Sequence, residues 1–125
     1  MSFNVLAHGT ILASAIRNAG TAYSTYLKVE SCDRVVFMVD VSNPSGTTKF
    51  LDITVETTDA IDSSNAGALW YEIKTFAQID AAGNFLLVVN KSDGFLRHLR
   101  LKNVISGSGT PKFTTVNRYT LLNER

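Results

Sequence analysis

Six carboxylates are spaced along residues 33–62, and carboxylates can support acid–base catalysis or metal binding. They are Asp33, Asp40, Asp52, Glu56, Asp59 and Asp62. A catalytic carboxylate pair is defined by its separation in space, which spacing along the sequence does not establish. Asp59 and Asp62 supply the oxygen ligands that calcium prefers, but their loop lacks the density of acids of a strong site. We expect both to be turn residues, and we predict no metal site.

The cysteine and the two histidines form no recognisable catalytic set. Cys32 is the single cysteine and lies beside Asp33, an acid that raises the pKa of a neighbouring thiol. No Gly-x-Ser-x-Gly, phosphate-binding loop, dinucleotide fingerprint or His-Glu-x-x-His occurs. We therefore predict a protein that is not an enzyme, with no catalytic residues and no cofactor.

Three basic residues, His98, Arg100 and Lys102, alternate with leucines and so share the outer face of an expected strand. This basic face can bind phosphate or an acidic partner surface, or it can pair across strands with acids such as Asp52 and Glu56. Lysine and arginine total 12 against 11 aspartate and glutamate, a net charge of +1. This balance favours cross-strand pairing and argues against nucleic acid or a membrane as the partner.

The elements that position these residues are expected to be strands. Hydrophobic residues make up 45% of the 125 residues and charged residues 18%, which excludes intrinsic disorder. Leu51, Ile53 and Val55 alternate with polar residues, the pattern of a strand with one solvent-facing side. Turn signals recur about every 12 residues. We predict a single all-β domain over residues 1–125: an antiparallel, jelly-roll-like β-sandwich of about eight strands, with little or no helix.

Three local features are expected within this sandwich. Asp93-Gly94 between two apolar runs predicts a hairpin. A change of parity along residues 69–79 predicts a β-bulge near Lys74–Thr75. Residues 1–30 fit both a helix and a strand, and residues 1–10, which have no evident strand partner, are expected to form an N-terminal arm.

Two apolar runs, Val35–Val39 and Phe85–Val89, do not alternate as a half-exposed strand should. Their second face must be covered, because exposed apolar patches mark interaction sites. The cover is the N-terminal segment, another copy of the chain or a different protein. We favour a closed oligomer.

The order of several segments resembles that of small β-sandwich virion proteins of tailed bacteriophages, of the head decoration (cement) type. The segments are Val5–Ala15, Leu51–Thr58, Leu69–Tyr71, Phe76–Gly83, Leu96–Leu101 and Gly107–Phe113. The resemblance implies a jelly-roll-like sandwich without a cofactor, made in the host cytoplasm and carried on the capsid exterior. It also implies contacts with the major capsid protein and with symmetry-related copies, for which a trimer is expected.

Loops at the ends of a sandwich are free to vary, so we expect the partner contacts there and in the N-terminal segment. The expected contact residues are Phe3, Asn4, Val5, Asn43, Pro44, Asp59, Asp62, Asn65, Thr110 and Pro111. One alternative is a carbohydrate-binding module in which Trp70, Tyr71 or a loop tyrosine stacks on a host glycan. Another is a neck, tail or fibre component of the same kind of particle.

Overall fold

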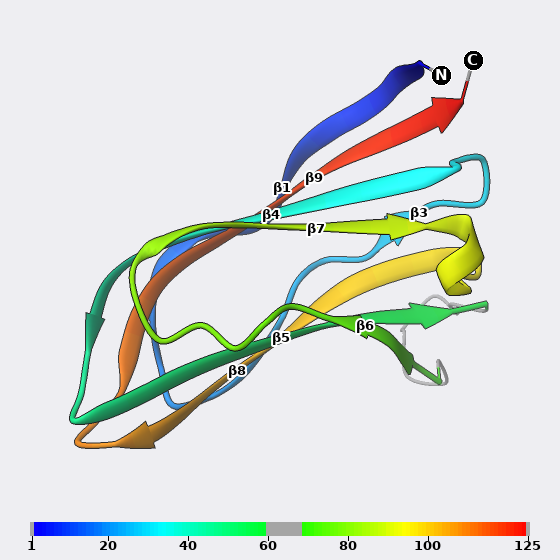
Figure 1. The fold of residues 1–125 in the computed structure, drawn as a ribbon. Coiled ribbons are helices and arrows are strands. Elements are labelled where there is room, and N and C mark those ends of the chain that lie inside the picture. Colours follow the sequence, from blue (N-terminus) through cyan, green and yellow to red (C-terminus); the bar gives the residue numbers. More distant parts are fainter. Residues whose placement is uncertain (1, 60–68, 125) are drawn as a thin grey trace.

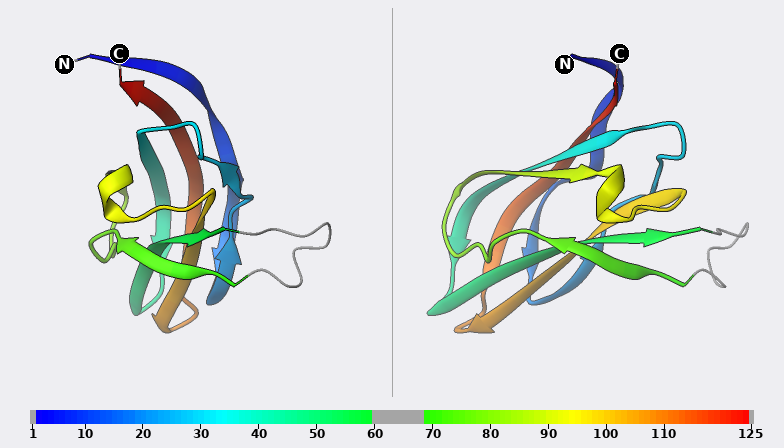
Figure 2. Two further views of the ribbon diagram at one scale, coloured as in Figure 1. Left: turned by 90° about the vertical axis from the view of Figure 1, so that its right-hand side faces the viewer. Right: turned by 45° about the vertical axis from the view of Figure 1, so that its right-hand side comes forward.

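Two antiparallel sheets packed face to face make up most of the protein, whose computed structural model describes residues 2–59 and 69–124 (Figures 1 and 2). The first sheet has the strand order β1 (Phe3–Asn18), β9 (Lys112–Glu124), β4 (Arg34–Ser45), β7 (Gly83–Asn90). The second has the order β2 (Gly20–Tyr23), β8 (His98–Ser108), β5 (Thr48–Thr58), β6 (Tyr71–Thr75), and β3 (Leu27–Lys28) also pairs with β8. The predicted fold class is confirmed.

The connections follow jelly-roll topology. Because β2 and β3 both pair with β8, they count as one interrupted strand. In chain order the first sheet then contains strands one, eight, three and six, and the second contains strands two, seven, four and five. Among the described strands, counted in this way, β5 and β6 are the one consecutive pair that belongs to the same sheet. All other consecutive pairs cross from one sheet to the other, as in a double-sheet jelly roll.

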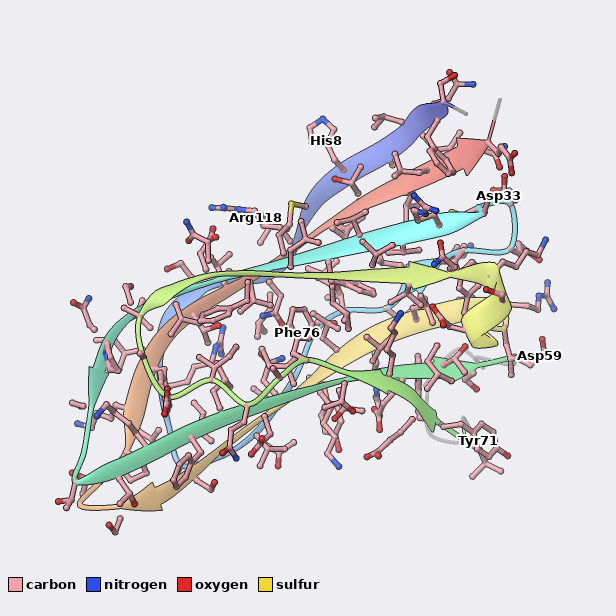
Figure 3. The ribbon with its side chains drawn as sticks, viewed as in Figure 1. His8, Asp33, Asp59, Tyr71, Phe76 and Arg118 are labelled. Atoms are coloured by element: carbon pink, nitrogen blue, oxygen red, sulfur yellow. The ribbon has the colours of Figure 1, made fainter. Side chains whose placement is uncertain are left out.

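The core lies between the sheets and is built by alternation along each strand. Leu51, Ile53 and Val55 of β5 are fully buried, as their spacing predicts. Phe37 of β4 and Phe113 of β9 are the largest fully buried side chains and come from the opposite sheet. Phe76, which follows β6, also lies between the sheets (Figure 3).

The loops gather at two ends of the sandwich. One end holds the turns β1–β2, β4–β5 and β8–β9 and the segment between β6 and β7 (Figure 1). The other end holds the β3–β4 and β7–β8 connections and both termini, as the right-hand view of Figure 2 also shows. This division decides which of the expected contact residues lie near one another.

The β4–β5 and β8–β9 turns are held together by a close backbone approach. The Thr47 N–H donates to the Ser108 carbonyl at 3.0 Å. Gly107 has a φ of +132°, and a Cβ at this position would lie 2.1 Å from the Thr48 carbonyl oxygen. Glycine meets both demands because it has no Cβ. The two turns therefore form one unit at this end.

The expected Asp93-Gly94 hairpin is wrong, because β7 and β8 belong to different sheets. A 3-10 turn, η1 (Lys91–Asp93), carries the chain across and ends at Gly94 with a φ of +97°. The Asp93 carboxylate accepts the Asn90 N–H at 2.7 Å and the Lys74 ammonium at 3.1 Å. The backbone hydrogen bond, followed by the Lys74 contact, lowers the pKa of Asp93. The chain does turn at this dipeptide, but the Asp93 side chain stabilises the turn, and the two strands beside it do not pair.

The expected β-bulge lies one residue before its predicted place. Val55 of β5 faces Lys74, whereas the next residue, Glu56, faces Glu72, so Ile73 is the extra residue of β6. The strand then ends at Thr75 instead of continuing to Ile79. Ile79 forms only an isolated bridge with β5.

Residues 3–10 pair with a neighbouring strand, whereas the sequence predicts an N-terminal arm over residues 1–10. β1 pairs with β9 from Phe3 opposite Glu124 to Asn18 opposite Lys112. Three register shifts along this pairing interrupt the period-two pattern, which explains why the sequence fits both a helix and a strand. Contact of this segment with a neighbouring protein stays a prediction.

A reciprocal amide pair crosses the core between the two sheets. The side-chain amide of Asn103 in β8 donates to Asn117 Oδ1 at 2.8 Å, and that of Asn117 in β9 donates to Asn103 Oδ1 at 3.1 Å. The two residues are 1% and 0% exposed. Buried amides are stable only when hydrogen-bonded, so this pair fixes how β8 and β9 lie against each other.

We predict that Asn103→Val and Asn117→Val each lower the free energy of unfolding by about 2–3 kcal/mol, because each leaves a buried amide without its partner. The double variant should be less destabilised than the sum of the two, since it leaves neither amide behind. Urea unfolding of the four proteins measures this cycle. Strict additivity of the two changes would contradict the coupling.

Candidate functional site

The outer face of the first sheet carries an apolar patch at the β4–β7 edge. Val36 and Met38 of β4 face Val88 and Leu86 of β7 across the strand pair. We call these four residues the β4–β7 patch. Leu86 is 62% exposed, and the other three are partly exposed. These side chains lie on the outer face of the two apolar runs. The residues that alternate with them point inward and pack in the core.

Polar side chains border the β4–β7 patch along the same strands. On one side Arg34 donates to Asn90 Oδ1 at 2.7 Å. On the other side Arg118 of β9 forms an ion pair with Asp40 of β4. His8 and Arg118 point away from the second sheet (Figure 3). An apolar centre with a polar rim is the anatomy of a protein–protein interface.

The N-terminal segment reaches the border of the β4–β7 patch, where the Phe3 ring lies 4.3 Å from the Arg34 guanidinium, but it leaves Leu86 62% exposed. β1 lies at the opposite edge of the sheet, separated from β4 by β9. Of the three covers that the sequence allowed, the intramolecular one therefore does not extend over Leu86 of β7. The physical reason is that β1 satisfies its backbone hydrogen bonds by extending the sheet beside β9.

The free edge of β7 is shielded by Lys74 of β6. Its ammonium donates to the Val88 carbonyl at 2.8 Å and forms an ion pair with Asp93 at 3.1 Å. A lysine placed over an edge strand blocks pairing with another strand. A partner is therefore expected on the face of β7 and not along its edge.

The outer face of the second sheet holds an arginine clamped by aromatic rings. Arg100 Nε donates to Glu56 Oε1 at 2.8 Å, and these residues face each other across β8 and β5. The Arg100 guanidinium lies 4.1 Å from the ring centroids of both Tyr23 and Trp70. The Glu56 side chain is 8% exposed beneath this arrangement. Cation–π contacts and the ion pair together fix the guanidinium.

A hollow of about 430 Å³ lies beside this arginine, and we call it the Arg100 pocket. Its lining residues are Ser24, Thr25, Tyr26, Trp70 and Arg100. The segment between β2 and β3 is fixed by hydroxyl groups: Ser24 Oγ accepts the Leu101 N–H at 2.8 Å, and Thr25 Oγ1 donates to the Ile11 carbonyl at 3.2 Å.

The sequence singles out Trp70 and the basic strand separately, and it allows a loop tyrosine as a stacking platform without identifying Tyr23 or Tyr26. The pocket is lined by segments around residues 24, 70 and 100, which are far apart in the sequence. No local sequence motif indicates that these segments lie together. The one sequence signal is Tyr23-Ser-Thr-Tyr26, where two aromatics flank the break between short strands. Tyr71 does not line the pocket and is 56% exposed.

The expected basic face lies on the outer side of β8, since Leu99 and Leu101 between its members are fully buried. Arg100 pairs with Glu56, as the cross-strand interpretation proposed. His98 contacts Tyr26 edge to face, with ring centroids 5.4 Å apart.

Asp52, the other acid considered for cross-strand pairing, accepts hydrogen bonds from Gln78 at 3.0 and 3.2 Å.

The expected contact residues fall at opposite ends of the sandwich. Asn43, Pro44, Thr110 and Pro111 lie around the joined β4–β5 and β8–β9 turns. Phe3, Asn4, Val5 and Asp59 lie at or toward the other end (Figure 3). Asp62 and Asn65 lie outside the described residues. One flat partner surface therefore does not reach both groups on the same copy.

The catalytic and metal candidates that the structure describes form no metal-binding cluster. Cys32 is 1% exposed, and burial, followed by the charge of Asp33, raises the pKa of its thiol. Within residues 2–59 and 69–124, no cluster of three or more His, Cys, Asp and Glu side chains is arranged to hold a metal ion. No helix in the same part of the chain is long and apolar enough to cross a membrane.

We predict that Arg100→Ala lowers the free energy of unfolding by about 3 kcal/mol, because it leaves Glu56 buried without its counter-charge. Arg97→Ala is the matched control. Arg97 also pairs with a glutamate, Glu30, at 3.1 Å, but both side chains are 56% exposed. Its loss should cost less than about 1 kcal/mol. Equal losses in urea unfolding would show that Glu56 does not depend on Arg100.

Acidification should destabilise the fold through His98. Burial, followed by the charge of Arg97, lowers the pKa of His98 below its ordinary value of 6.5. The unfolded chain then binds the proton more readily, so this contribution to stability is complete above about pH 6.5 and is lost as the pH falls toward the folded-state pKa.

The melting temperature should therefore fall between about pH 7.5 and about pH 5.5, and by less in His98→Gln. His8→Gln changes an exposed histidine and should keep the full decrease. An unchanged decrease in His98→Gln would contradict the assignment.

The sequence matches no protein-family model and no curated protein. Solved structures share its fold, among them that of the infectious bursal disease virus Gx strain, with a TM-score of 0.63 and 11% identity over 97% of this chain. The VP2 subviral particle of the same virus gives a TM-score of 0.60 and 11% identity over 98% of the chain. This chain covers 32% and 33% of those chains. At such identity the likeness shows the jelly-roll fold alone.

Proposed function

We propose that this chain is a non-enzymatic structural protein of a virus particle, and more specifically a decoration protein on the capsid exterior of a tailed phage. The observation that carries the proposal is the β4–β7 patch, with Leu86 62% exposed on an otherwise ordered sheet. An apolar surface rimmed by polar side chains is stabilised when a protein covers it.

The comparisons support the viral part of the proposal. Structures described as infectious bursal disease virus and its VP2 subviral particle contain the same fold in longer chains. The decoration role and the tailed-phage context rest on the sequence resemblance around Leu51–Thr58 and Gly107–Phe113. Both are proposals for this chain.

The physical role follows from interface area. A standard protein–protein interface buries about 1,600 Å² in total. The four side chains of the β4–β7 patch supply only part of this area. The β4–β7 patch is then the apolar centre, and the ion pair of Arg118 with Asp40 belongs to the polar rim. We assign the patch to contacts between copies, with a trimer as the expected assembly. The loops at the sandwich ends are left to contact the major capsid protein.

Leu86→Glu should weaken self-association at least tenfold, because it places a charge in the apolar centre of the interface. Ile16→Glu is the matched control, since Ile16 is 72% exposed and lies on β1, at the other edge of the sheet. Sedimentation at about 100 μM protein measures the oligomer. A wild-type protein that stays monomeric and does not bind particles would contradict the proposal.

Cryo-electron microscopy of the phage particle tests the position. Density for the jelly roll on the capsid exterior is the expected result. Density confined to the neck, tail or fibres would refute the head assignment and leave a structural role elsewhere in the particle.

A further inference from the structure

The Arg100 pocket has the dimensions and lining of a small-molecule site. Its volume of about 430 Å³ falls within the usual range for such sites. It lies on the second sheet, whereas the β4–β7 patch lies on the first. A ligand in this pocket therefore leaves the proposed assembly surface free.

The walls of the Arg100 pocket combine the aromatic rings of Tyr26 and Trp70 with one fixed hydrogen-bond donor, the Arg100 guanidinium. Tyr26 is 39% exposed and Trp70 is partly exposed, so a ligand can reach both side chains. Arg100 occupies one face of the Trp70 ring, so the ligand contacts Trp70 on its remaining surface. Arg100 uses Nε for Glu56, whereas its two terminal nitrogens carry four of the five N–H donors of a guanidinium. The rings of Tyr23 and Trp70 hold that guanidinium in place, so little side-chain entropy is lost when it binds.

The charge balance of the pocket selects the ligand class. Glu56 neutralises Arg100 at 2.8 Å, so the pair has no net charge to attract a phosphate or a nucleic acid strand. Neutral hydroxyl oxygens remain suitable acceptors for the guanidinium N–H groups. A pyranose ring has these hydroxyls around its rim and an apolar C–H face that packs on an aromatic ring.

We propose that the Arg100 pocket binds a neutral saccharide, with a sugar ring packed against Trp70 and Tyr26 and its hydroxyls accepting hydrogen bonds from Arg100. Ser24 and Thr25 also line the pocket, but their hydroxyls are already engaged with the backbone. Recognition therefore depends on the two rings and the guanidinium.

The chain reports on this pocket directly, because Trp70 is its only tryptophan. Titration of the full chain with methyl glycosides of glucose, galactose, mannose and N-acetylglucosamine should give a saturable change of tryptophan emission for at least one sugar, with a Kd of about 1 mM or tighter. A neutral glycan array then extends the search to oligosaccharides.

Tyr26→Ala should weaken the binding about tenfold, because it removes one wall of the pocket. Tyr71→Ala is the matched control: Tyr71 is an exposed aromatic adjacent to Trp70 but outside the pocket, and its loss should leave the affinity unchanged. Thermal melting verifies that both variants fold. Should Tyr26→Ala fail to fold, Trp70→Phe on the array provides the second test, with weaker binding expected.

Three outcomes would overturn the assignment: no saturable response to any glycoside or array glycan, saccharide binding that survives both pocket variants, or a saturable response to mononucleotides or peptides alone. Each is independent of the oligomer and the position in the particle, so failure here leaves the proposed structural role standing.

Discussion

The contact between Asn103 and Asn117 joins the two strands on which most of the structure is assembled. β8 pairs with β2, β3 and β5, and β9 pairs with β1 and β4. Only β6 and β7 lack a direct pairing with either strand among the described elements. Apolar packing alone allows two sheets to slide over each other, whereas a pair of buried amides has one satisfied arrangement. The relative position of the sheets, and therefore of their outer faces, depends on this arrangement.

The two outer faces are chemically different because the strands beneath them differ. β4 and β7 carry apolar side chains on both sides, so the face of the first sheet is suited to a large dry contact. β8 alternates leucines with His98, Arg100 and Lys102, and its face is polar except where aromatic rings cover the arginine. One small domain thus presents an assembly surface and a separate pocket.

Sequence patterns predicted those parts of the fold that depend on neighbours in the chain. Leu51, Ile53 and Val55 alternate without interruption, so both the strand and its buried face were predictable. The bulges of β1 disrupt the same signal and leave its first residues ambiguous. The Asp93-Gly94 turn was recognisable, but whether it joins one sheet or two depends on where β7 finds its partner. The Arg100 pocket was beyond prediction, because its residues meet only after the sheets form.

Both ends of the described chain leave the sandwich together. Phe3 lies opposite Glu124 at the start of the β1–β9 pair, and paired strands are about 4.8 Å apart. A linker of a few residues can therefore span from Glu124 to Phe3, and a permutant joined there and opened at an exposed turn should keep every strand in place. The same geometry allows the domain to be inserted into a surface loop of another protein, because the two ends of the loop need not move apart. The β1–β9 pairing therefore concentrates the entry and the exit of the chain at one point of the domain surface.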